Sequence, residues 1–266
     1  MIVAAARSGI ATAARGGIVV AGDPHGNFTP ILRDCAAREP GTLILLGDCE
    51  LRVPLRQQLA PLFAAGWAVR WILGNKDAET DTVYDRLAVD FPEGDIGGKI
   101  IEIAGLRIAG LGGVFKPRIW CPSGNGAEPP SFGTRAEFLA SLDPREHWRG
   151  GLPLWHRDSI FPEDFARLEQ QRFDVLITHE APSSHRHGFA AIDRLAEAAK
   201  ARLIVHGHHH ESYAKTLANG IDVRGLAVAE TWALEMTTPS RTTRAGVAGR
   251  KMSALSSSAT LARATR

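Results

Sequence analysis

The chain has 266 residues, 44% of them hydrophobic, and a formal net charge of +2, which is the composition of a globular protein with one large core or two modest domains. Its three cysteines are too few and too scattered for a disulfide framework or a thiolate metal site. No apolar run resembles a signal peptide or approaches the roughly 20 residues of a membrane span, so we expect a cytoplasmic protein without a membrane partner.

Positive charge is concentrated at the carboxyl end of the chain. Residues 237–266 carry six basic side chains and no acidic one. We expect residues 1–16 to be an N-terminal extension, 17–236 to be the folded domain and 237–266 to be a disordered basic tail. Nucleic acid is a partner that only this tail suggests.

Three apolar strands are predicted in the first part of the chain, at residues 18–21, 42–46 and 67–73. Helical patterns at 28–38 and 54–65 separate them, which predicts a β-α-β arrangement with both sheet faces covered. In such sheets ligands lie beyond the carboxyl ends of the strands. We therefore expect a site where these three strands end.

Each of these strands stops at a glycine followed by a polar residue. The first runs into Gly22, Asp23 and His25, and the second into Gly47 and Asp48. The third ends at Gly74 followed by Asn75. Glycine beside a carboxylate is common in ordinary turns, so the pattern gains weight only through its repetition.

The middle of the chain is less regular. A helix at 80–89 and two strands at 99–104 and 106–111 are predicted, joined by a tight turn at Gly105. The stretch 114–161 is rich in proline and glycine, and we expect an irregular insert that forms a lid. The alternative is an ordered loop that covers the sheet edge.

Two further strands end at histidine. The strand at 174–178 runs into His179, and the strand at 203–206 runs through His206 and Gly207 to His208. Because Gly207 places no side chain between them, we expect His206 and His208 to converge on one ion or on two adjacent ions. The remaining predicted elements are helices at 162–171 and 192–201, a hairpin at 213–217 and 222–228 around Asn219-Gly220, and a last strand within 230–236.

Seven candidate metal ligands follow from these strand ends: Asp23, His25, Asp48, Asn75, His179, His206 and His208. Oxygen and imidazole ligands without thiolates suit manganese, zinc, iron or cobalt. Seven ligands exceed the needs of one four-coordinate ion. Two ions about 3.5–4 Å apart that share a carboxylate account for the number, and this is a usual arrangement for hydrolysis of phosphate esters. Asp48 is the expected bridge.

The order of these motifs resembles the calcineurin-like metallophosphoesterases over roughly residues 18–236. The blocks that carry the resemblance are Asp23-x-His25, Gly47-Asp48, Gly74-Asn75, Thr178-His179 and His206-Gly207-His208. The resemblance implies an α/β (α+β) fold in which two packed mixed β-sheets are flanked by helices as a four-layer sandwich. It also implies two divalent metal ions, with manganese expected and iron, zinc or cobalt as alternatives. The first ion would be held by Asp23, His25, Asp48 and His208, and the second by Asp48, Asn75, His179 and His206.

The implied activity is hydrolysis of a phosphomonoester or phosphodiester by a metal-bridging hydroxide. A small phosphate ester or nucleotide is the expected substrate. The chain has no G-x-S-x-G elbow, P-loop or dinucleotide-binding glycine motif that would support another chemistry. Two alternatives remain: nuclease-like activity on nucleic-acid ends, and a catalytically weakened metal-binding scaffold.

One position departs from the family pattern. A histidine usually follows the Gly-Asn pair and is oriented by the next acid, whereas this chain has Lys76 followed by Asp77. With an ordinary pKa of about 10.4, lysine is a poor proton donor at neutral pH. We expect Lys76 and Asp77 to be catalytic, Lys76 through its charge, and Asn75, Lys76 and His209 to contact substrate. His209 and His210 are candidate proton donors and are not expected to bind metal.

Overall fold

The first sheet contains four strands in the order β10-β1-β2-β3. β1, β2 and β3 run parallel, and β10 pairs with β1 in the antiparallel direction. The computed structural model describes residues 16–122 and 129–235, so the predicted basic tail and nearly all of the N-terminal extension lie outside the described residues. The bounds of the four strands are β1 Ile18–Ala21, β2 Thr42–Leu45, β3 Ala68–Trp71 and β10 Thr231–Leu234.

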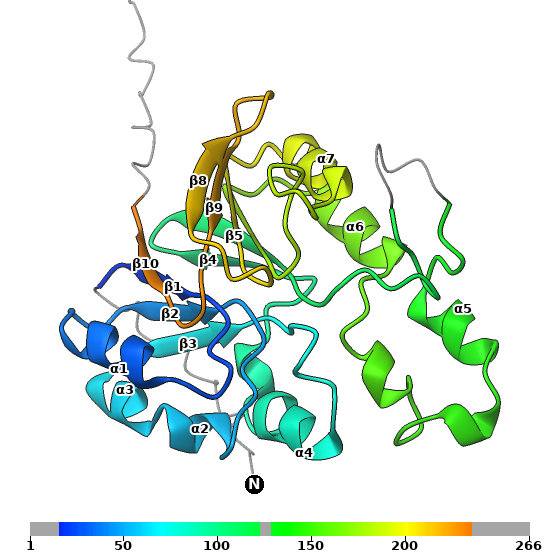
Figure 1. Cartoon of the computed structure of the whole chain (residues 1–266), viewed down its shortest axis with the longest axis horizontal. Coiled ribbons are helices and arrows are strands. Elements are labelled where there is room, and N and C mark those ends of the chain that lie inside the picture. Colours follow the sequence, from blue (N-terminus) through cyan, green and yellow to red (C-terminus); the bar gives the residue numbers. More distant parts are fainter. Residues whose placement is uncertain (1–15, 123–128, 236–266) are drawn as a thin grey trace, which may run out of the picture. The chain divides into compact units, whose positions relative to one another are not determined.

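Three helices connect the parallel strands and cover the outer face of this sheet (Figure 1). Helix α1 (Thr29–Ala36) joins β1 to β2, and α2 (Leu55–Gln58) and α3 (Ala60–Ala65) join β2 to β3. The helix predicted at 54–65 is thus divided at Leu59, just before Pro61. Proline in a helix interior removes a hydrogen bond, and here it occupies the first turn of α3.

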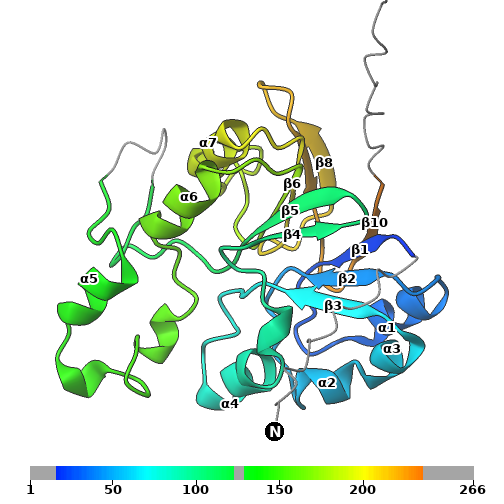
Figure 2. The ribbon, with the colours of Figure 1, turned by 180° about the vertical axis from the view of Figure 1, so that it is seen from behind.

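The second sheet contains six strands in the order β4-β5-β6-β7-β9-β8. The central strands β5, β6, β7 and β9 are parallel, and antiparallel hairpins form both edges. Helices α6 (Pro162–Glu169) and α7 (Ala190–Ala198) pack on its outer face (Figure 2). The strand bounds are β4 Ile100–Ile103, β5 Leu106–Leu111, β6 Val175–Thr178, β7 Leu203–His206, β8 Tyr213–Thr216 and β9 Asp222–Gly225.

The two sheets pack face to face through a continuous apolar layer. Alternate residues of each strand point into it: Ile18 and Val20 from β1 meet Ile177 from β6 and Val205 from β7. The intervening residues point outward, so that Val19 packs against the helices of the first sheet. This period-two alternation produces four layers. The predicted fold, two packed mixed β-sheets flanked by helices, is confirmed.

The insert between β5 and α6 is more regular than predicted. It contains helix α5 (Arg135–Ala140), whose start is capped by a reciprocal pair of hydrogen bonds between Thr134 and Glu137. A small apolar core of its own stabilises the insert. The members of that core are Ile119, Phe138, Leu142, Leu152 and Phe161.

The shorter elements are helix α4 (Asp81–Tyr84), the π-helical turn η1 (Asp85–Val89), and the 3-10 turns η2 (Pro92–Gly94), η3 (Pro144–Glu146) and η4 (Leu154–His156). Within the described residues, no helix combines the length and the hydropathy that a bilayer span would require.

Candidate metal centre

The loops that follow the strands adopt an uncommon backbone conformation. Five non-glycine residues in these loops have φ in the left-handed region, between +43° and +70°. Such a conformation costs about 1–3 kcal/mol per residue and persists only where the surroundings enforce it. The five residues are His25, Asp48, Glu50, His208 and His210.

Two glycines let these loops approach one another closely. A Cβ on Gly207 would lie 2.2 Å from Asp23 Oδ1, and a Cβ on Gly74 would lie 2.2 Å from Asp48 Oδ1. Neither position therefore admits a side chain without displacing a candidate ligand.

Asp23, His25 and His210 form the first group of ligand-type atoms. His25 Nε2 lies 2.8 Å from His210 Nε2, which in turn lies 3.5 Å from Asp23 Oδ2. The other ring nitrogen of His25 is 2.5 Å from Glu50 Oε2. Because a carboxylate accepts from a ring N–H, Glu50 leaves the Nε2 lone pair of His25 facing the group.

Asp48, His179 and His208 form the second group. His179 is fully buried, and its Nδ1–H donates to the carbonyl oxygen of Leu46 at 2.7 Å. Its Nε2 then faces Asp48 Oδ1 at 3.5 Å, Asn75 Oδ1 at 3.1 Å and His208 Nδ1 at 3.1 Å. Four ligand-type side chains thus meet at one point.

Asp48 lies between the two groups. Its Oδ1 is 3.5 Å from His179 Nε2, and its Oδ2 is 3.9 Å from His25 Nε2. The two oxygens of one carboxylate therefore face different groups, which is the disposition that a bridging ligand requires.

The structure corrects the expectation that His206 and His208 converge. His206 is the last residue of β7 and shares a face with Ile204, which packs against the helices of the second sheet. Its Nε2 is 2.7 Å from the Tyr213 hydroxyl, and His206 belongs to none of the three groups found among residues 16–122 and 129–235. The residue that joins Asp23 and His25 is His210, which we had not expected near a metal.

Two further side chains extend the second group. Glu180 is buried, and together with His208 and His209 it forms a third set of ligand-type atoms within reach of one another. Its Oε1 accepts from the Phe115 backbone N–H, while its Oε2 lies 3.9 Å from His208 Nε2. His209 stacks on His185 with ring centroids 4.0 Å apart.

Lys76 and Asp77 do not contact each other through their side chains as the family pattern would require. Lys76 Nζ pairs with Glu79 at 2.6 Å, and this pairing raises the pKa of Lys76 further. Asp77 is fully buried and accepts from the backbone N–H groups of Cys49 and Gly74, each at 2.8 Å. It thereby links the loop that carries Asp48 to the loop that carries Asn75.

The donor set fits divalent cations. Asp23 Oδ1 is buried and has no hydrogen-bond partner among the described residues. Asp48 Oδ1 accepts from the Lys76 backbone N–H at 2.7 Å, and both it and Asn75 Oδ1 also face the Nε2 of His179. A cation would satisfy the unpartnered oxygen of Asp23 together with the oxygen and nitrogen lone pairs that face it.

Burial controls the protonation of these groups. It lowers the pKa of His208 to about 3 and of His209 to about 4, so both imidazoles are neutral at pH 7, as metal ligation requires. Burial also raises the pKa of Asp23. Burial alone would lower the pKa of His179, but the charges of Asp23 and Asp48 outweigh it and raise the value. The two carboxylates thus favour a positive charge on or beside the buried His179 imidazole.

A family model for calcineurin-like phosphoesterases matches residues 17–212. The chain belongs to this family. It is therefore a phosphoesterase, and members of the family depend on metal ions for hydrolysis of phosphate esters.

The phosphoesterase is 39% identical over 197 residues to an uncharacterized protein of Haemophilus influenzae, a match that covers 74% of this chain and 84% of that protein. Among solved structures, TT1561 of Thermus thermophilus is similar with a TM-score of 0.48 and 14% identity, covering 80% of this chain and 90% of that one. Phosphopantetheinyl hydrolase of Mycobacterium tuberculosis is similar with a TM-score of 0.45 and 18% identity, and the match covers 82% of this chain and 92% of that one.

The buried position of Asp77 predicts a structural role that its neighbour Glu79 lacks. Replacing Asp77 by Ala leaves two buried N–H groups without an acceptor, so we expect a loss of about 2–5 kcal/mol in the free energy of unfolding. Glu79→Ala removes only a half-exposed ion pair and should cost less than about 1 kcal/mol. Urea unfolding of the two variants measures the difference, and equal losses would show that Asp77 does not hold the two loops together.

Proposed function

We propose that this phosphoesterase hydrolyses a small phosphate ester or a nucleotide at a dinuclear metal centre. The observation that carries the proposal is the placement of Asp48, whose two carboxylate oxygens face separate groups of ligand-type side chains. A single-ion site would leave one of these groups without a function.

The ligand assignment that the geometry supports replaces His206 by His210 and moves His208 from the first ion to the second. Asp23, His25, Asp48 and His210 would hold one ion, and Asp48, Asn75, His179 and His208 the other. Manganese is the proposed metal, since the set contains oxygen and imidazole ligands only. When bound, the two cations would supply positive charge to the phosphoryl oxygens and lower the pKa of water.

The residues of this chain would orient the ligands and the substrate. Glu50 holds the ring of His25, and the Leu46 carbonyl holds the ring of His179. Lys76 follows Asn75, and its backbone N–H donates to Asp48 Oδ1 at 2.7 Å. Its ammonium group pairs with Glu79, and the charges of Asp48 and Glu50 also contribute to raising its pKa. We propose that Lys76 stabilises the negative charge of the phosphoryl group, with His209 as a further substrate contact.

Metal removal tests the proposed activity. After chelation, the chain should lose hydrolysis of p-nitrophenyl phosphate or of its bis ester, and about two equivalents of manganese should restore it. Asp48→Asn should lower turnover by more than about 100-fold, whereas Asp222→Asn, on the exposed edge hairpin, should leave it unchanged. Binding of two ions without hydrolysis of either ester would instead support a metal-binding scaffold.

The revised ligand set predicts opposite behaviour for two histidines. His210→Ala should weaken binding of one of two manganese ions by at least about tenfold, because it removes a ring nitrogen from the first group. His206→Gln retains a hydrogen-bonding side chain beside Tyr213 and should bind both ions as the wild type does. Calorimetric titration with manganese separates the two, and the reverse result would restore His206 to the ligand set.

An electrostatic role for Lys76 predicts a moderate kinetic effect. Lys76→Gln removes the charge and should lower kcat/KM for p-nitrophenyl phosphate by roughly tenfold, while Lys76→Arg should retain most of the activity. Lys200 is an exposed lysine just after α7, and Lys200→Gln serves as the matched control. Unchanged turnover of both activated and poor leaving-group esters in Lys76→Gln would remove this residue from the mechanism.

A further inference from the structure

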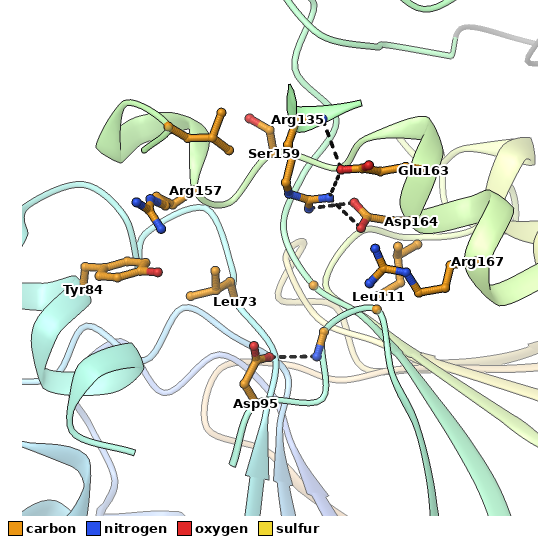
Figure 3. A pocket seen from close by; sticks show the side chains of 14 residues that line it. Leu73, Tyr84, Asp95, Leu111, Arg135, Arg157, Ser159, Glu163, Asp164 and Arg167 are labelled. Carbon is orange, nitrogen blue, oxygen red and sulfur yellow. Dashed lines mark hydrogen bonds and ion pairs between the residues drawn. The ribbon is translucent and has the colours of Figure 1, made fainter. Parts of the chain in front are cut away.

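A second polar cavity of about 350 Å³ lies between the edge of the sandwich and the insert. Leu73 and Gly112, which follow β3 and β5, form part of its lining (Figure 3). Most of the rest comes from α4, α5, α6, the segment before α6 and the segment before β4. Cavities of this size hold small molecules.

The cavity is separate from the metal centre. None of the residues in the three ligand groups lines it. The Gly113 N–H donates to the Leu73 carbonyl oxygen at 2.6 Å, and a Cβ on Gly112 would lie 2.8 Å from the Leu73 backbone nitrogen. Closely packed backbone therefore joins the segments after β3 and β5 where they line the cavity.

One of the three arginines that line the cavity is already neutralised. Arg135 donates to Glu163 and makes a bidentate pair with Asp164, with all three contacts at 2.8 Å. Figure 3 shows this network on the wall formed by α6. The remaining acid, Asp95, accepts from Gly97 N–H and has Lys99 3.9 Å away.

The other two arginines lack an acidic partner among the described residues. Arg157 lies near the rings of Trp148 and Tyr84, at 5.0 and 5.9 Å from their centroids, and its Nε is buried without a hydrogen-bond acceptor. The guanidinium of Arg167 makes no ion pair within residues 16–122 and 129–235, although its charge contributes to lowering the pKa of Glu163. Two guanidinium groups are thus available to a ligand.

Their positions define the ligand. Arg157, beside the Tyr84 hydroxyl, and Arg167, on α6, lie at opposite ends of the cavity (Figure 3). A ligand with an anionic group at each end matches this arrangement. We propose that this cavity is a second ligand site that binds a small dianion with a carboxylate or phosphate group at each end.

Calorimetry of the metal-loaded full-length chain at fixed ionic strength tests the site. Succinate carries two carboxylates, and 3-phosphonopropionate carries a carboxylate and a phosphonate that a phosphoesterase cannot hydrolyse, so the two probes distinguish the sources of negative charge. We expect one equivalent of at least one of them to bind. Arg157→Met and Arg167→Met should each weaken that binding by roughly tenfold or more. Arg172→Met, at an exposed arginine outside the cavity, should not change it.

Several results would overturn the proposal. Absence of binding of both probes would do so, as would equal affinity in the wild type and both cavity variants. If Arg157→Met fails to fold, the Arg167→Met variant still tests the proposal, because Arg167 is exposed on α6. Both variants should hydrolyse p-nitrophenyl phosphate with wild-type kcat and KM. A raised KM would make the cavity part of substrate binding and not a second site.

Discussion

The structure depends on the close approach of buried carboxylates and imidazole nitrogens, in which Asp23 Oδ1 has no hydrogen-bond donor among the described residues. Asp23 and Asp48 are buried, and Glu50 and the Leu46 carbonyl orient His25 and His179 so that the Nε2 of each ring faces Asp48. Without a cation this arrangement costs free energy, since the buried Asp23 Oδ1 lacks a donor and the pKa of Asp23 rises. Divalent cations would turn the same arrangement into a stabilising one.

The fold supplies the rigidity that such a centre needs. The face-to-face sheets fix the strand ends, and the loops beyond them are held in left-handed conformations by close packing at Gly74 and Gly207. Asp77 adds a direct link between the loops of Asp48 and Asn75. Strain in the loops is therefore supported by a core that extends through both sheets.

Apolar runs ending in glycine and a ligand-type residue predicted the parallel strands and most of the residues that meet at the centre, whereas the two-sheet fold was implied by the resemblance to the phosphoesterase family. His206 was misplaced because it was treated as aiming along the strand, whereas strand alternation turns it toward Tyr213. The spacing Thr134-x-x-Glu137 could have revealed α5, since it forms a capping box. The roles of Glu50 and Glu180, and the arginine-lined cavity, depend on contacts between distant segments that no local pattern encodes.

Crystallography of the manganese-loaded chain, with anomalous scattering at the manganese edge, tests the central claim most directly. Two anomalous peaks on either side of Asp48 are expected, one within bonding distance of Asp23, His25 and His210 and the other of Asn75, His179 and His208. A single peak, or a peak ligated by His206, would contradict the account.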